Sequence, residues 1–282
     1  MCSGVINVIL NLIFVIVFNM NVAGVALATI IAQAISAGLC VRKLMVREDA
    51  CKFTIIKMKV YWPEFAKMIR IGLPAGIQGS LFSISNVAIQ SAVNSFGEIL
   101  VAGNSAATSI EGFMYVTLNS FHQTAVNFVG QNYGAKQYDR AKKITWICFA
   151  CVSVTGIAIS WTVLAVCGPL LGIYIEDSAE AIAYGMIRFA VCNPIYFVLG
   201  LQDVFTGVLR GYGQSLAPMI ISVLGICGVR VGWIYTIFQI PKYHTPQWLY
   251  MSFPISWVVT LVIQFVFYVI LMRRFKKQGY TC

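Results

Sequence analysis

The stretch VGQNYGAKQYDRAKK, residues 129–143, separates two long apolar runs of the chain. It holds two glycines and four basic residues, whereas the runs beside it, 99–129 and 144–168, are almost free of charge. Each run is long enough to cross the ~30 Å hydrocarbon core of a bilayer as an α-helix. The stretch is therefore predicted to be a basic turn between two membrane-spanning helices, in which Gly130 and Gly134 let the chain turn tightly.

The composition of the whole chain supports this interpretation. Hydrophobic residues make up 59% of the 282 residues, charged residues only 11%, and the mean hydropathy is +0.79. A soluble domain carries about 25% charged residues, so lipid is the expected surroundings and partner of this chain. The net charge of +10 does not predict a nucleic-acid partner, because the basic residues lie at the ends of apolar segments. No cleavable signal peptide is expected.

Eight apolar stretches are long enough to span a bilayer. They cover approximately residues 3–18, 22–41, 66–94, 99–129, 144–168, 181–209, 215–240 and 248–271. If all eight span, 17 of the 20 Lys and Arg residues fall on one side of the membrane. Because basic loops stay in the cytoplasm, both ends of this chain are predicted to be cytoplasmic.

Two similar basic helix exits predict how the spans are grouped. VRKLMVR follows the second span and LMRRFKK follows the eighth, as in the repeated bundles of transporters. We therefore expect residues 1–46 to be the last two helices of a first lobe. Residues 47–65 are then a basic cytoplasmic inter-lobe loop, and residues 66–282 a complete six-helix second lobe. On this interpretation the protein needs four more helices in front of the chain.

Two carboxylates at membrane depth are the ion-coupling candidates. A charge at the bilayer centre costs ~2.5–3.5 kcal/mol on insertion scales, so it is kept only with partners or water. Glu111 lies near the middle of the fourth span, and a carboxyl there suits the binding of a proton or cation. Asp203 lies near the end of the sixth span, as a coupling carboxylate or a structural anchor. Arg210 on the same face is ~10 Å away along the axis, too far for a direct pair.

Polar residues at helical spacing give the third and fourth spans one polar face each. Such faces turn toward protein or a water-filled cavity, with interhelical hydrogen bonding as the alternative. Arg230 is interpreted as a counter-ion or a snorkelling residue, and Arg188 as a snorkelling residue near the outer end of its span. The cavity-lining candidates are Ser83, Asn86, Gln90, Asn94, Asn104, Thr108, Tyr115, Asn119, His122 and Arg230.

Prolines and glycines within and between the spans are candidates for bending points. A proline removes one backbone hydrogen bond and permits a kink, which a transporter uses for alternating access; simple packing is the alternative. The hinge candidates are Gly72, Pro74, Gly76, Gly130, Gly134 and Pro194.

The sequence contains no HExxH, GxSxG or Walker motif, so we do not expect an enzyme. Cys148 and Cys151 form a CxxC spacing, but they lie inside an apolar run without a second pair or a nearby His. We interpret them as small helix residues and expect no metal site. Transport would have to draw on an ion gradient, with H⁺ or Na⁺ as the coupling ion and no other cofactor.

Three long stretches resemble the second lobe of multidrug and toxic compound extrusion (MATE) transporters, in particular their DinF-like bacterial branch. They are RIGLPAGIQGSLFSISNVAIQSAVNSFG, VAGNSAATSIEGFMYVTLNSFHQTAVNFVGQNYGAKQYDRAKK and DVFTGVLRGYGQSLAPM. GVINVILNLIFVIVFNMNVAGVALATIIAQ resembles the last two helices of the first lobe. The combination of GLP, VGQN-GA and LRG at these spacings carries the resemblance.

The resemblance implies twelve helices in two lobes around a V-shaped cavity in a bacterial inner membrane, of which this chain is the C-terminal two-thirds. It implies export of drugs or other cationic or amphiphilic small molecules in exchange for H⁺ or Na⁺, by alternating access. A lipid-linked saccharide flippase and an inactive truncated fragment are the alternatives. Phe82 stands where some members have a cation-binding glutamate, and Asn11 replaces the aspartate of an NxxLDP pattern. Glu111 and Asp203 remain as the carboxylate candidates.

Overall fold

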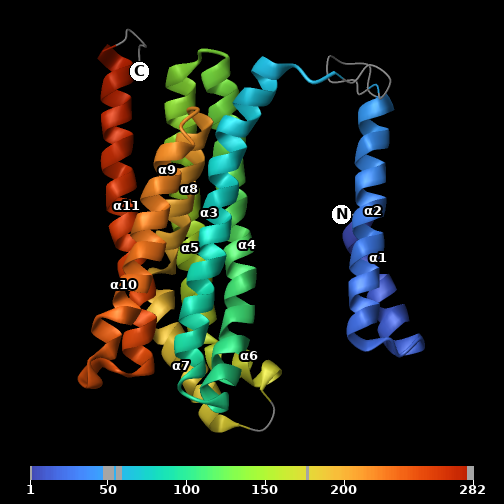
Figure 1. The fold of residues 1–282 in the computed structure, drawn as a ribbon, viewed down its shortest axis with the longest axis vertical. Coiled ribbons are helices and arrows are strands. Elements are labelled where there is room, and N and C mark those ends of the chain that lie inside the picture. Colours follow the sequence, from blue (N-terminus) through green and yellow to red (C-terminus); the bar gives the residue numbers. More distant parts are fainter. Residues whose placement is uncertain (1, 47–53, 55–58, 176–177, 278–282) are drawn as a thin grey trace. The chain divides into compact units, whose positions relative to one another are not determined.

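The computed structural model describes residues 2–46, 54, 59–175 and 178–277, which form an all-helical fold without a strand in these ranges. The chain divides into two units, Met1–Trp62 and Pro63–Cys282 (Figure 1). Most of the inter-lobe loop expected over 47–65 lies outside the described residues. The assignment of the two units to lobes stays a prediction.

The first unit is a helical hairpin. It consists of α1 (Cys2–Leu12), the π-helical turn η1 (Ile13–Val17) and α2 (Asn21–Val46). The connection turns at Asn19 and Asn21, with φ of 52° and 46°, a region in which Asn is enriched. Asn7 Nδ2 donates to Thr29 Oγ1 at 3.4 Å and joins the two arms. Most apolar side chains of both arms are exposed, as expected for helices that face lipid or another helix.

The second unit is a bundle of long helices (Figure 1). Its elements are α3 (Trp62–Asn94), α4 (Glu98–Gly134), α5 (Tyr138–Ala165), α6 (Cys167–Tyr174), α7 (Ala179–Cys192), η3 (Asn193–Ile195), α8 (Tyr196–Gly211), α9 (Leu216–Ser222), η4 (Val223–Gly228), α10 (Val229–Tyr235), η5 (Ile237–Gln239), η6 (Pro241–Tyr243) and α11 (Pro246–Lys277). Each predicted span overlaps one helix or a run of consecutive helical segments.

Five helical segments are long and apolar enough to cross a membrane. They are Asn21–Val46, Tyr138–Ala165, Ala179–Gly211, Leu216–Gln239 and Pro246–Phe275. The apolar segment Ser3–Val17 is shorter. The helices α3 and α4 have 33 and 37 residues and thus the length to span, but their polar residues lower their hydropathy. The count of eight spans therefore stays a prediction.

Close packing of α4 against α7 and α8 builds the centre of the second unit. Glycines make this possible, because small residues let helix backbones approach in a membrane bundle. A Cβ added to Gly103 of α4 would collide with the carbonyl oxygen of Ala181 on α7. A Cβ added to Gly207 of α8 would lie 2.7 Å from the carbonyl oxygen of His122 on α4. These contacts bring the backbone of α4 close to those of α7 and α8.

The basic stretch 129–143 turns in a different way from the one predicted. Helix α4 continues through Gly130 to Gly134, and the residue with a left-handed backbone is Lys136, with φ of 58°. Gly130 instead packs on α8, where a Cβ added to Gly211 would lie 3.1 Å from the Gly130 nitrogen. The prediction that the two glycines make the turn was wrong, because both belong to α4 and the chain turns after Gly134, at Lys136.

The other hinge candidates occupy two settings. Helix α3 is continuous through Pro74, and a Cβ added to Gly72 or Gly76 would meet open space. Pro194 lies in the 3₁₀ turn η3 that interrupts the predicted sixth span between α7 and α8. A proline at the start of a helical segment is well tolerated there, since its missing N–H has no partner to lose. Whether any of these positions bends during function stays a prediction.

Candidate functional site

A cavity of about 480 Å³ lies in the second unit, lined by residues of α3, α4, α7, α8, η4, α10 and α11. Both carboxylate candidates, Glu111 and Asp203, line it. Six predicted lining residues lie there as well, namely Asn86, Gln90, Asn104, Thr108, Tyr115 and Arg230. The apolar part of the wall includes Phe82, Ile89, Leu199, Ile226, Phe253 and Trp257.

Four predicted lining residues lie outside this wall. They are Ser83, Asn94, Asn119 and His122. On α3 the cavity face is centred near Phe82 and Ile89, and a helical side chain one position further on points ~100° away. Ser83 is accordingly exposed, with its hydroxyl bonded to the carbonyl of Gly79 in its own helix at 3.2 Å. The sequence thus predicted the correct helix, but the predicted polar face of α3 is rotated by about one residue from the face that lines the cavity.

His122 has a structural contact instead of a place in the cavity wall. Its side chain is buried, and Nδ1 donates to the backbone carbonyl oxygen of Asp203 at 2.7 Å. The bond joins α4 to α8 at the position where Gly207 lets the two backbones approach. His122 therefore positions the helix segment that carries Asp203.

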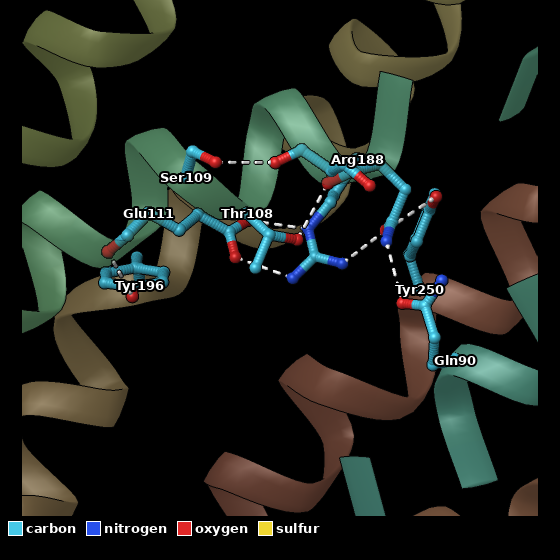
Figure 2. Close-up of polar contacts among 9 residues, drawn as sticks. Gln90, Thr108, Ser109, Glu111, Arg188, Tyr196 and Tyr250 are labelled. Carbon is cyan, nitrogen blue, oxygen red and sulfur yellow. Dashed lines mark hydrogen bonds and ion pairs between the residues drawn. The ribbon is translucent and has the colours of Figure 1, made fainter. Parts of the chain in front are cut away.

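Glu111 is held by a buried ion pair with Arg188 (Figure 2). Arg188 Nε donates to Glu111 Oε1 at 2.9 Å and Nη2 donates to Oε2 at 2.6 Å, a bidentate pairing of planar groups. The two side chains come from α4 and α7, and both residues are less than a tenth exposed. Tyr196 donates its hydroxyl to the Glu111 carbonyl oxygen at 3.3 Å.

The network continues from Arg188 to two more helices (Figure 2). Arg188 Nη1 donates to Asn104 Oδ1 at 2.7 Å, and the Tyr250 hydroxyl of α11 donates to the same oxygen at 3.2 Å. Asn104 Nδ2 in turn donates to Gln90 Oε1 of α3 at 3.5 Å. One buried charge pair with its polar neighbours thus connects α3, α4, α7 and α11.

The prediction that Arg188 snorkels to the membrane surface was wrong. Arg188 is only 5% exposed, and its guanidinium lies 5.4 Å from the ring centre of Tyr250 and 5.0 Å from that of Phe253. A carboxylate supplied by α4 and two aromatic rings of α11 make burial favourable, since a buried charge needs a partner. The sequence of α7 alone shows neither partner.

Asp203 stands in contrast, because one of its oxygens has no partner. Among the described residues, the buried Oδ2 atom accepts no hydrogen bond and the carboxylate makes no ion pair within 4.0 Å. Arg210, one candidate anchor on the same helix, donates from Nη2 to Gln78 Oε1 of α3 at 2.9 Å. The arrangement gives the cavity one unpaired acid group.

Arg230 lines the cavity without a carboxylate partner in the described part of the chain. Its Nε donates to Ser256 Oγ of α11 at 3.1 Å, and its guanidinium carbon lies 4.2 Å from the ring centre of Phe253. It is 7% exposed, which excludes the snorkelling alternative. Arg230 and Asp203 are the two charges of the cavity wall that lack an opposite charge in contact.

Several site residues could not be found by sequence reasoning. The cavity is also lined or supported by side chains of α8 and α11 that the sequence analysis did not name as site residues, namely Tyr196, Gln202, Tyr250 and Phe253. The described residues contain no group of three or more His, Cys, Asp and Glu side chains that would hold a metal ion. What the site offers is a wall of aromatic and amide side chains with two unpaired opposite charges.

Comparison with known proteins identifies the family. The MatE family model matches residues 74–236, more than half of the chain. A probable multidrug resistance protein YpnP of Bacillus subtilis is 28% identical over 80% of this chain and 50% of its own length. A probable multidrug resistance protein NorM of Thermotoga maritima is 24% identical over 76% of this chain and 46% of its own length.

A solved structure agrees with the fold. The Vibrio cholerae MATE transporter VcmN in its bent form superposes with a TM-score of 0.82 at 18% identity, over 99% of this chain and 62% of that one. The chain spans about half the length of the curated relatives that it matches. Its placement in the DinF-like branch stays a prediction. The chain belongs to the MATE family and is a multi-pass membrane protein.

Proposed function

We propose that this chain forms the cavity-bearing part of a secondary active transporter that exports drugs or other amphiphilic or cationic small molecules in exchange for H⁺ or Na⁺. The observation that carries the proposal is the unpartnered carboxylate of Asp203 in a cavity walled by aromatic side chains. Such a group binds either a coupling ion or the amine of a substrate, and competition between the two gives antiport.

Asp203 is the better coupling candidate of the two carboxylates. Both oxygens of Glu111 already accept hydrogen bonds from Arg188, so protonation of Glu111 would leave a buried arginine without its partner. Protonation of Asp203 breaks no ion pair in the described residues. We therefore assign coupling to Asp203 and a structural role to Glu111.

Alternating access would expose this cavity first to one side of a bacterial inner membrane and then to the other. The basic turn 129–143 and the basic C-terminal end would lie in the cytoplasm, following the excess of Lys and Arg there. The proposal covers the chain together with four further helices that complete a first lobe, in keeping with the greater length of the relatives.

An export assay tests the proposal. The chain and a form extended by four upstream helices are expressed in an efflux-deficient bacterium, and ethidium export is followed with and without a proton uncoupler. We expect export by the extended form only and loss of that export in Asp203→Asn. The matched control Asp139→Asn, whose side chain is exposed in the first turn of α5, should export normally. Normal export by Asp203→Asn would remove Asp203 from the coupling mechanism. Absence of export by the extended form would contradict the proposal, and export by the 282-residue chain alone would rule out the inactive-fragment alternative.

A lipid-linked saccharide flippase is the second candidate function. The observation in its favour is Arg230, a buried cavity base that would suit a phosphate group. It ranks second because the cavity wall offers one unpaired base and not a basic patch. Export of ethidium by the extended form would decide against it.

A further inference from the structure

Two buried arginines contact the same aromatic ring but differ in their partners. The guanidinium carbons of Arg188 and Arg230 lie 5.0 Å and 4.2 Å from the ring centre of Phe253. All three guanidinium nitrogens of Arg188 have side-chain acceptors, two on Glu111 and one on Asn104. Within the described part of the chain, Arg230 donates only from Nε, to Ser256, and it lines the cavity. One arginine is therefore neutralised and the other is not.

The position of Arg230 is fixed by its surroundings. Ser256 donates its own hydroxyl proton to the Phe253 carbonyl at 2.7 Å, so its oxygen is left to accept from Arg230 Nε. The Phe253 ring covers one face of the guanidinium. The Nη1 and Nη2 groups have no acceptor among the described residues. A planar donor pair held in this way matches the two oxygens of a carboxylate or phosphate.

The charges that line the cavity sum to zero. Glu111 and Arg188 cancel as a pair, and Asp203 and Arg230 remain, with no ion pair between them. A ligand that satisfies both needs an oxyanion for Arg230 and a cationic group for Asp203. Because an unpaired charge inside a membrane protein is costly, a zwitterion lowers the electrostatic cost more than a simple cation does.

We propose that Arg230 is the oxyanion-binding residue of this cavity and that the substrates are amphiphiles carrying an oxyanion together with an amine. This inference rests on the proposed function and narrows its substrate class. The amine would compete with the coupling ion at Asp203, as antiport requires, while the oxyanion binds Arg230. The apolar body packs on Phe82, Leu199 and Trp257 of the wall.

A matched pair of fluorescent probes tests the inference. Nε-dansyl-lysine and dansylcadaverine share the dansyl group, the five-carbon chain and the amine, and differ by one carboxylate. Their dissociation constants are measured by fluorescence anisotropy with the 282-residue chain in maltoside micelles. We expect dansyl-lysine to bind on the order of tenfold more tightly, as for one charge-assisted contact.

Variants decide whether Arg230 causes this preference. Arg230→Gln should bring the ratio of the two dissociation constants to about one, and Arg230→Lys should restore part of it. Arg140→Gln removes the same charge from an exposed position and should leave the ratio unchanged. If Arg230→Gln does not fold, Ser256→Ala serves instead, because it frees Nε but keeps the charge and should lower the ratio severalfold.

Two results would overturn the inference: equal binding of both probes by the unaltered chain, or an unchanged ratio in Arg230→Gln and Ser256→Ala. Neither result bears on ethidium export, so the inference and the proposed function can fail separately. Phosphatidylethanolamine added to the micelles separates two sources of the oxyanion. Competition with dansyl-lysine would assign the site to a lipid headgroup, and absence of competition would assign it to a free solute.

Discussion

The two ends of the cavity hold their carboxylates in opposite ways. At one end, Glu111 is bound by Arg188 inside a hydrogen-bond network that reaches four helices (Figure 2). At the other end, Asp203 is positioned through its backbone carbonyl by His122, and its Oδ2 atom has no partner in the described residues. The levels of Glu111 and His122 on α4 differ by roughly 16 Å at 1.5 Å per residue.

This difference in partners suits the two carboxylates to different roles. A carboxylate in a bidentate ion pair cannot change its charge without loss of the pair, so Glu111 stabilises the bundle in one arrangement. A carboxylate fixed only by its backbone can change its charge without loss of an ion pair, which is what the proposed coupling role requires of Asp203. Burial alone does not separate the proposed coupling group from the structural one. The two carboxylates differ in whether an opposite charge is in contact, which Glu111 has and Asp203 lacks among the described residues.

The largest effect is expected for removal of one partner of the Glu111–Arg188 pair. Glu111→Gln leaves the buried Arg188 without its carboxylate partner, and Arg188→Gln leaves the buried Glu111 carboxylate without its donors. Either change should lower the unfolding free energy by about 3–5 kcal/mol. The double variant should lose less unfolding free energy than the two single variants together, because neither charge is then left without its partner. Thermal unfolding in detergent, followed by tryptophan fluorescence, measures this.

Asp203→Asn is the matched comparison for that experiment. It removes one carboxylate from the same cavity but breaks no ion pair in the described residues. The unfolding free energy should therefore fall by less than about 1 kcal/mol. Equal losses of unfolding free energy in Glu111→Gln and Asp203→Asn would contradict the distinction between a paired carboxylate at Glu111 and an unpaired one at Asp203.

The sequence predicts much of this fold because the helices of a membrane protein appear as long apolar runs and the connections between them as basic segments. The polar stripe of α4 placed Asn104, Thr108, Glu111 and Tyr115 on a common face, and all four line the cavity. A 3.6-residue period depends only on local geometry, so one sequence suffices to find it.

What the sequence did not predict was pairing between helices. Arg188 is 77 positions from Glu111 and Tyr250 is 146 positions from Asn104, so neither contact has a local signal. Periodicity tells which residues share a face but not which helix that face meets. Gly130 shows the same limit, since its contact with Gly211 on α8 is long-range and a glycine in a turn-like motif is locally indistinguishable from one in a helix contact.

An intermediate effect is expected at the contact that positions Asp203. Gly207→Ala would place a methyl group 2.7 Å from the His122 carbonyl oxygen, a backbone atom that cannot move aside cheaply. Gly232→Ala is the control, because Gly232 is also helical but a Cβ there meets open space. Both variants gain the same helix propensity, so their difference in unfolding free energy should be about 1–3 kcal/mol from overpacking alone. Equal melting temperatures would show that the α4–α8 contact is adaptable and that His122 does not fix Asp203.

The smallest effect is expected for the link between the Asp203 end and α3. Gln78→Ala removes the acceptor of Arg210 Nη2, a single interhelical hydrogen bond. Such bonds in membrane bundles average ~0.6 kcal/mol, because the alternative states also find partners. Gln131→Ala on the exposed side of α4 provides the matched loss of one amide side chain. A difference near ~0.6 kcal/mol in unfolding free energy would show that this bond holds α3 only weakly. That result would agree with the proposed alternating access. A loss as large as that of Glu111→Gln would mean that both ends of the cavity are rigid, and Asp203 would then lose the freedom that distinguishes it from Glu111.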